Sequence, residues 1–478
     1  MQQCAKAPSD NDSYEKRWLI FFAVVMITFI NCMDMSSINV ALPSIADELQ
    51  VTMAGIEWVV TAYTLVIICF ILLFGKLGDT IGKDKIFKFG ILVFLCGLCT
   101  CFFARSYPML LMGRIIEGVG AAATSANSQG IIVQVFPAQE RGKALGVSGS
   151  SVALGTMVGP SIGGLIVSHF RWNMIFGMSI PLCIIGFFLC MKYLPDMSTG
   201  KKEKVDFAGV GLFMVMILCL YGGVKLLQNG AAYYLYCAVL VMVSIVFGMI
   251  FARWEGRHDN AMLQLGIFKN KLYAVSVFCA FISFLAISGH NFIQPFYLQK
   301  VQLLSAAQTG MLMMAYSLTM FVVAPFSGQL SDKIGSEILC FIGLCIVSVA
   351  LFILSTLGIG SPIWIFLIGS IMMSLGMAMF QSPNTSLIMS TVGPKLTGIA
   401  GSINGLARNL GSVFGISLST VLLYNIMSTQ LGVTVTDFVA GGEQAFVTGM
   451  QWVYRCMAMV SLLGAVLTGL RWKKSKEE

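Results

Sequence analysis

The chain has 478 residues, of which 57% are hydrophobic and only 11% are charged, and its mean hydropathy is +0.84. A soluble protein of this length needs more charge on its surface, so the composition excludes a soluble globular protein and indicates a polytopic membrane protein. The net charge of +8 does not indicate nucleic-acid binding, because the Lys and Arg residues lie at the ends of apolar segments.

Apolar segments long enough to cross a bilayer recur along the whole chain, since a spanning helix needs about 20 residues. We expect fourteen of them, at 18–42, 54–74, 86–104, 108–136, 144–167, 173–193, 207–227, 231–252, 273–298, 309–330, 338–358, 362–390, 398–427 and 448–470. If the N-terminus is cytoplasmic, 23 of the 30 Lys and Arg residues lie in cytoplasmic segments, four at or near the outside and three within spans. The positive-inside rule therefore predicts that both termini are cytoplasmic.

The predicted fold is all-α, with two six-helix bundles and two extra central helices. Residues Ala261–Phe268 form the pattern of a short amphipathic helix on the inner leaflet. The expected organisation is a cytoplasmic tail at 1–17, a bundle at 18–193, a linker with two spans and the amphipathic segment at 194–272, a second bundle at 273–470 and a cytoplasmic tail at 471–478.

A charged, glycine-rich turn follows the second span and has a looser copy in the second half of the chain. Its residues are Gly75, Gly78, Asp79, Gly82 and Lys83, and the copy contains Asp332 and Gly335. A second match relates residues 142–159 to residues 398–415. Internal repeats are typical of transporters, which place a binding site between two bundles that rock against each other.

Three charged residues are predicted to lie inside the hydrocarbon region: Asp34, Arg114 and Glu117. Such residues are costly in lipid unless they are paired, so they are candidates for function. Arg114 and Glu117 are three residues apart and share a helix face, and Arg114 is placed to bridge Asp34 or Glu117. Burial and a nearby arginine act in opposite directions on the charge of a carboxylate, so we expect its protonation to follow conformation. The alternative is a static buried ion pair.

Polar residues in the predicted second bundle are candidates for substrate binding, with buried packing residues as the alternative. They are His290, Asn291, Gln294, Tyr297, Tyr316, Gln381, Asn384, Asn404 and Arg408. Arg408 suits an anionic ligand or a carboxylate partner. Glu57 and Lys225 lie near span ends, where we expect their charged groups to reach the interface by snorkelling.

A glycine-rich motif in the fifth span combines close helix packing with a proline kink. Its residues are Gly155, Gly159, Pro160, Gly163 and Gly164. The 14 Cys residues are scattered through apolar runs, so we predict no metal site.

Four motifs in this order resemble the fourteen-helix drug:proton antiporters of the major facilitator superfamily, over nearly the whole chain. They are Met33-Asp34-x4-Asn39-Val40-Ala41-Leu42-Pro43, Gly75–Lys85, Arg114-x2-Glu117-Gly118-x-Gly120-Ala121-Ala122 and Gly155-x3-Gly159-Pro160-x2-Gly163-Gly164. The resemblance implies that the charged turn is a gate latch and that the fifth-span motif seals an antiporter against leak. That family usually has Gln where this chain has Glu117.

These observations predict a transporter rather than an enzyme, driven by the proton gradient without a cofactor. We expect export of hydrophobic or amphipathic compounds in exchange for protons; the alternatives are proton-coupled uptake of an amphipathic organic anion such as a bile acid, and a non-transporting receptor or sensor. The expected setting is the plasma membrane, with anionic inner-leaflet lipids near the Lys residues, a small-molecule substrate, no nucleic acid and a monomeric protein.

Overall fold

A computed structural model of the protein describes residues 16–197, 206–257, 265–392 and 397–477. Over these residues the chain forms fourteen long α-helices and no β-strand. They are α2 (Arg17–Leu49), α3 (Met53–Ile81), α4 (Lys83–Phe102), α5 (Tyr107–Val135), α6 (Ala138–His169), α7 (Met174–Tyr193), α8 (Phe207–Leu226), α9 (Tyr234–Glu255), α10 (Lys271–Phe296), α11 (Ala306–Ile334), α12 (Ser336–Leu354), α13 (Ile363–Ser390), α14 (Thr397–Leu431) and α15 (Glu443–Glu477).

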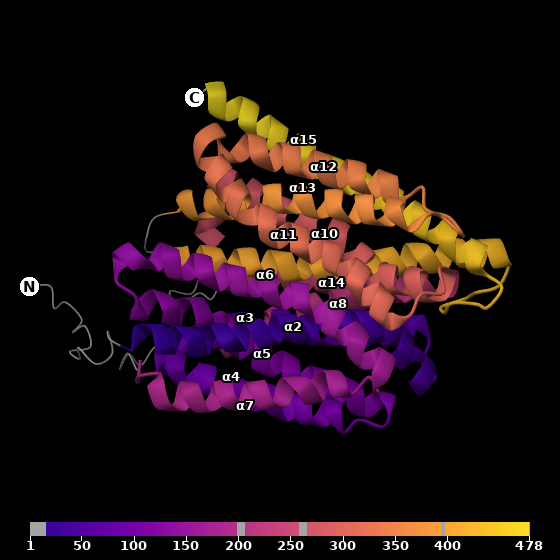
Figure 1. Cartoon of the computed structure of the whole chain (residues 1–478). Helices are drawn as coiled ribbons and strands as arrows, with labels where there is room; N and C mark the ends of the chain where they lie inside the picture. Colours follow the sequence, from indigo (N-terminus) through magenta and orange to yellow (C-terminus); the bar gives the residue numbers. More distant parts are fainter. Residues whose placement is uncertain (1–15, 198–205, 258–264, 393–396, 478) are drawn as a thin grey trace, which may run out of the picture.

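Thirteen of the described helices are long and apolar enough to cross a membrane. The remaining long helix, α5, carries Arg114, Glu117 and many small residues, which lower its hydropathy. Each helix covers all or most of a predicted span, because a bilayer requires an apolar run of a minimum length, and α2, α3 and α15 run several residues past it. The predicted all-α fold is therefore confirmed. Helix α2 begins and helix α15 ends on the same side of the molecule, at the left of Figure 1. We refer to the opposite side as the outer side.

Corresponding helices of the two halves pack in corresponding ways. Helix α6 packs on α2 within the first bundle, and α14 packs on α10 within the second. Each of these helices also crosses to the other bundle, since α6 contacts α11 and α14 contacts α3. The two bundles therefore meet along two equivalent seams, α6–α11 and α3–α14.

The charged turn is shorter in the structure than the sequence indicated. Helix α3 continues through Gly75, Gly78 and Asp79 to Ile81, and α4 begins at Lys83, so Gly82 alone separates the two helices. Gly82 has φ +130°, and Gly335, between α11 and α12, has φ +96°. Glycine adopts this region without steric cost, which explains its presence at both corners. The residues expected between the spans 54–74 and 86–104 are thus mostly helical, and the repeat of the turn is reproduced in the backbone.

The predicted amphipathic segment at 261–268 lies mostly outside the described residues. Its last residues belong to a 3-10 helix, η3 (Leu265–Lys269), next to α10.

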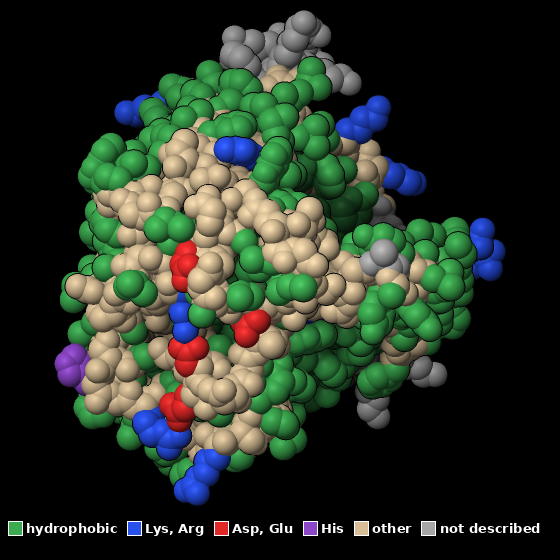
Figure 2. All heavy atoms as spheres, turned by 90° about the vertical axis from the view of Figure 1, so that its right-hand side faces the viewer, with side chains coloured by type: hydrophobic (Ala, Val, Ile, Leu, Met, Phe, Trp, Pro, Cys, Tyr) green, Lys and Arg blue, Asp and Glu red, His purple; other side chains and the backbone are tan. Residues whose placement is uncertain are grey.

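The bundles contact each other at the outer side. The Ala54 N–H of α3 donates to the Thr436 carbonyl at 3.1 Å, and the Met53 N–H donates to the Asp437 carboxylate at 2.9 Å, in the loop between α14 and α15. A second contact between the bundles involves α2: the side-chain amide of Gln299, just after α10, donates to the Val40 carbonyl at 2.8 Å. Figure 2 views this outer face, where acidic and basic side chains form a column in the left half of the view and hydrophobic side chains lie around it. The structure is thus closed on its outer side.

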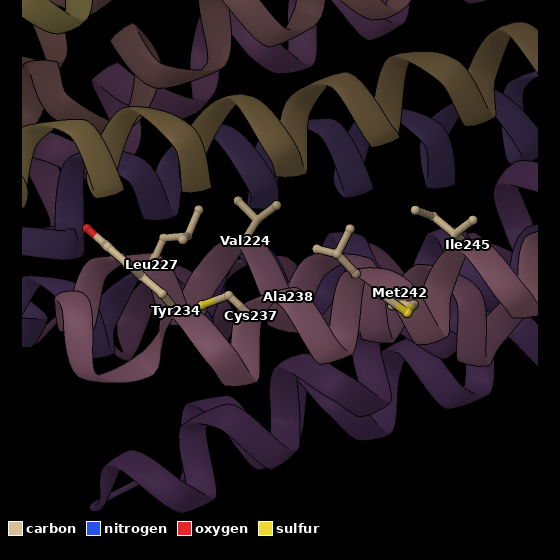
Figure 3. Close-up of a pocket in the computed structure, with 9 residues that line it drawn as sticks. Val224, Leu227, Tyr234, Cys237, Ala238, Met242 and Ile245 are labelled. Atoms are coloured by element: carbon tan, nitrogen blue, oxygen red, sulfur yellow. The ribbon is translucent and has the colours of Figure 1, made fainter.

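The two extra helices, α8 and α9, form a hairpin beside the bundles. An apolar cavity of about 450 Å³ lies on this hairpin, lined by Gly223, Val224, Leu227, Tyr234, Cys237, Ala238, Val241, Met242 and Ile245 (Figure 3). Several lining side chains of α9 are more than half exposed, including Met242 and Ile245. An apolar surface of this kind faces lipid in a membrane protein.

Candidate functional site

A buried cluster of three charged residues occupies the interior of the first bundle. The Arg114 Nη1 of α5 lies 2.7 Å from the Asp34 Oδ2 of α2 and 2.5 Å from the Glu117 Oε2 of α5. All three side chains are 0% exposed. The Arg114 Nε also donates to the Val59 carbonyl of α3 at 3.1 Å. The structure therefore brings the three predicted intramembrane charges together around one guanidinium.

The sequence places these groups by simple helix geometry. Arg114 and Glu117 are separated by three residues of one helix, so both side chains leave the same face of α5. Gly97 of α4 makes room for Glu117, since a Cβ added at Gly97 would come within 2.5 Å of the Glu117 Cγ. Asn31 of α2 donates to Thr124 of α5 at 3.1 Å and holds the same pair of helices together.

The cluster contains one more carboxylate than it has cations. Among the described residues, the Asp34 Oδ1, the Glu117 Oε1 and the Arg114 Nη2 have no hydrogen-bond partner. One guanidinium neutralises one carboxylate, so the second carboxyl group needs a proton or another partner to avoid an uncompensated charge.

Each bundle contains an arginine packed against an aromatic ring. The Tyr63 ring of α3 lies 4.2 Å from the Arg114 Cζ, a cation–π arrangement. The Arg408 Cζ of α14 lies 4.6 Å from the centroid of the Phe284 ring of α10. One such arrangement thus lies in the first bundle and one in the second.

Arg408 is half-buried, and it has no ion-pair partner within the part of the chain that the structure describes. Its neighbour on the helix, Gly405, has open space where a Cβ would stand. A guanidinium at this depth without a carboxylate is able to receive an anion.

Three of the polar residues predicted to bind substrate face the interior of the second bundle instead. His290 is 1% exposed, its Nδ1 lies 3.0 Å from the Tyr454 hydroxyl, and its ring stacks on Phe366. Gln294 is 3% exposed, and the Tyr297 hydroxyl donates to the Gly358 carbonyl at 2.9 Å. These contacts correspond to the buried packing alternative.

The other predicted polar residues are divided between packing and partly open positions. Asn384 is buried and donates to the Ser276 carbonyl at 3.0 Å, and Asn404 is buried on α14. Asn291, Tyr316 and Gln381 are half-buried. The structure therefore does not gather all nine residues at one place, and Arg408 is the member that carries a fixed charge.

The gate residues at the first helix corner form a local ion pair. Lys83 pairs with Asp79 across the Gly82 corner, and Gly78 packs so closely that an added Cβ would come within 1.8 Å of the Asn127 Oδ1 of α5. Asp332 lies at the equivalent corner, but its side chain is outside the described part of the chain.

The glycine motif of α6 lies against α2 and α11. An added Cβ at Gly159 would come within 2.8 Å of the Met33 carbonyl, and one at Gly163 within 2.6 Å of the Ser37 carbonyl. A Cβ added at Gly164 would come within 2.4 Å of the Ala306 carbonyl of α11. Gly155 also contacts α2. The Pro160 carbonyl of α6 lies close to Gly310 of α11. The motif therefore forms both an intrabundle contact and the α6–α11 seam.

Glu57 and Lys225 form a second buried ion pair that the sequence reading missed. Lys225 of α8 is 5% exposed and Glu57 of α3 is 0% exposed, and their charged groups are in direct contact. The expectation that both side chains snorkel to the interface was wrong, because each finds an opposite charge inside the protein. The signal in the sequence is one acidic and one basic residue at similar depth, but nothing in it indicates that α8 packs on α3.

Comparison with known proteins places this chain among transporters. A family profile described as Major Facilitator Superfamily matches residues 24–416 and 276–478. The chain belongs to the Major Facilitator Superfamily. The riboflavin transporter RibZ of Clostridioides difficile is 30% identical over 462 residues, covering 96% of this chain and 99% of that protein. The lincomycin resistance protein LmrB of Listeria monocytogenes is 27% identical over 457 residues, covering 93% and 95%.

A further relative is the multidrug resistance protein Stp of Mycobacterium tuberculosis, 28% identical over 415 residues and covering 86% of this chain and 77% of that protein. A solved D-xylose–proton symporter has a TM-score of 0.67 at 15% identity, covering 94% of this chain and 97% of that chain. At this identity the likeness concerns the fold alone. The resemblance predicted from the four motifs is confirmed, and the chain is a multi-pass membrane transporter rather than an enzyme.

Proposed function

We propose that the protein is a proton-driven transporter that exports hydrophobic or amphipathic organic compounds across the plasma membrane in exchange for protons. The observation that carries this proposal is the buried cluster of Asp34, Arg114 and Glu117. The lincomycin resistance protein LmrB and the multidrug resistance protein Stp are similar over most of the chain, which supports export. No cofactor is needed in this scheme, because the proton gradient supplies the energy.

The charge balance of the cluster supports a proton-carrying role. With both carboxyl groups ionised, the cluster would hold one net negative charge in a site with no exposed surface. An uncompensated charge inside hydrocarbon costs several kcal/mol, so the closed cluster favours one bound proton. Opening α2 or α3 to water would remove that cost and release the proton. Proton binding and conformation are then coupled through the same three side chains.

Purified protein in lipid vesicles with an imposed pH gradient tests the proposal. Labelled organic cations, bile-type anions and neutral drugs are added in turn, and substrate and proton movements are followed together. Exchange predicts that substrate moves opposite to protons. Movement of neither substrate nor protons with any member of the panel would contradict transport and favour a receptor.

A specific observation favours a second candidate, proton-coupled uptake of an amphipathic organic anion. Arg408 is a half-buried cation beside the aromatic Phe284, with no carboxylate partner within the described residues. A guanidinium over an aromatic ring suits a flat or amphipathic anion, which uses both the charge and the apolar surface. The riboflavin transporter RibZ is also similar over nearly the whole chain.

The same vesicles separate the two candidates. Uptake predicts that an aromatic carboxylate enters together with protons, and that its uncharged amide does not compete with it. Export predicts opposite movement and competition by neutral and cationic compounds.

A further inference from the structure

The hairpin of α8 and α9 behaves structurally as one unit. The Trp254 indole of α9 donates to the Asp206 carboxylate at the start of α8 at 2.7 Å, and the Ser244 hydroxyl donates to the Met216 carbonyl at 2.7 Å. These contacts join the two helices along their length. Figure 3 shows the two helices side by side, with apolar side chains lining the cavity on the hairpin.

Helix α8 is tied to the first bundle near the outer side. Lys225 pairs with Glu57 of α3 in a buried position, and its Nζ lies 3.5 Å from the Ala54 carbonyl. One turn earlier, the Tyr221 hydroxyl donates to the Thr61 hydroxyl of α3 at 3.2 Å. The rings of Tyr221 and Trp58 also pack edge to face at 5.3 Å. Because the ion pair is buried, separating α8 from α3 would leave two unpaired charges in hydrocarbon.

The same part of α8 also contacts the second bundle. The Tyr221 ring lies 6.4 Å from the Phe414 ring of α14, and η1 (Leu227–Asn229), which follows α8, contacts α14 as well. Tyr221 therefore stands where α3, α8 and α14 meet. Ala54 of α3 also joins the two bundles at this junction, since its N–H donates to the Thr436 carbonyl in the loop after α14.

We propose that the α8–α9 hairpin is a clamp on the outer side of the α3–α14 seam, with Lys225 and Glu57 as its positioning residues. The buried ion pair holds α8 on α3, and this position brings Tyr221 and η1 against α14. When the outer side opens, α3 and α14 separate, and the clamp leaves α14 while it stays on α3. The two extra helices thus stabilise the outside-closed state.

Hydrogen–deuterium exchange of the full chain in lipid nanodiscs tests the clamp. The Met53 and Ala54 amides are the reporters, because they donate to the Asp437 carboxylate and the Thr436 carbonyl only while the outer seam is closed. Lys225→Met and Glu57→Gln should each raise the exchange rate of peptides covering 51–58 and 432–438 at least threefold. Peptides at the inner corner around Gly82 should keep their wild-type rate.

Two further variants separate positioning from general loosening. The charge-exchanged double variant, Glu57→Lys with Lys225→Glu, should return outer exchange toward the wild-type rate relative to either single variant. Asp206→Asn, which removes the ionised acceptor for Trp254 at the inner end of the hairpin, should leave outer exchange unchanged. Unchanged exchange at 51–58 in both single variants, an equal rise at the inner corner, or a double variant no slower than the singles would overturn the proposal.

Discussion

The charge balance of the buried cluster makes a quantitative prediction about two amide substitutions. Asp34→Asn or Glu117→Gln alone leaves Arg114 with one carboxylate, so each single variant contains a neutral pair. The double variant leaves the guanidinium with no negative partner inside the bundle. The two substitutions should therefore be far from additive in their effect on stability.

The expected sizes follow from the contacts of Arg114. Each single change replaces one carboxyl group by a neutral amide while the other remains as the carboxylate partner of Arg114, which costs about 1 kcal/mol or less of unfolding free energy. Removing both leaves an uncompensated buried charge, which costs about 3–5 kcal/mol. The double variant should thus lose about 2 kcal/mol more than the two single variants together.

Denaturant titration of the purified protein in detergent measures these free energies. Asn31→Ala combined with Glu117→Gln is the matched control, because Asn31 joins the same two helices through a neutral hydrogen bond to Thr124. That control pair should be additive within about 0.5 kcal/mol. If Asp34→Asn and Glu117→Gln were also additive within that limit, the guanidinium would not depend on either carboxylate and the reasoning would fail.

Three other predictions concern the gate, the seam and the substrate. Asp79→Asn should lower the transport rate while the amount of protein in the membrane persists, because it removes the ion pair across the Gly82 corner; a normal transport rate would reject the gate role. Gly159→Ala should destabilise the protein by about 1–3 kcal/mol in a thermal or denaturant melt, since its Cβ would overlap α2, whereas Gly149→Ala on the same helix meets open space and should be neutral; equal effects would contradict the packing assignment. Arg408→Gln should weaken binding of an aromatic carboxylate about tenfold or more and leave its amide unaffected, and equal losses for both in a binding titration would remove the anion role.

The helices were predictable because one physical constraint fixes them. A bilayer requires an apolar run of a certain length, and the chain repeats such runs from α2 to α15. The charged corner was harder, since Gly75–Ile81 is polar enough to read as a loop but extends α3 beyond the apolar region. Hydropathy measures where lipid ends, and a helix can continue past that point.

The buried cluster was predictable in part. The spacing of Arg114 and Glu117 places both on one face, and the depth of Asp34 allows a contact, but the sequence alone does not determine which faces of α2 and α5 meet. The same limit explains His290, which is polar and mid-span yet faces Tyr454 and Phe366 within its own bundle. Polarity marks a residue that needs a partner, and tertiary packing decides whether the partner is protein or substrate.

The pair of Glu57 and Lys225 lay beyond sequence reasoning for a related reason. Each residue is close enough to a span end for snorkelling, and this local explanation is sufficient as long as neighbouring helices are unknown. Only the docking of α8 on α3 brings the two charges together.

The central claim is that the buried carboxylates couple transport to protons, and Asp34→Asn tests it most directly. In vesicles with a pH gradient, the wild-type protein should accumulate substrate against its concentration gradient. We predict that Asp34→Asn still exchanges labelled for unlabelled substrate across the membrane but no longer responds to the pH gradient. Accumulation by Asp34→Asn that follows the pH gradient as in the wild-type protein would contradict the proposed coupling.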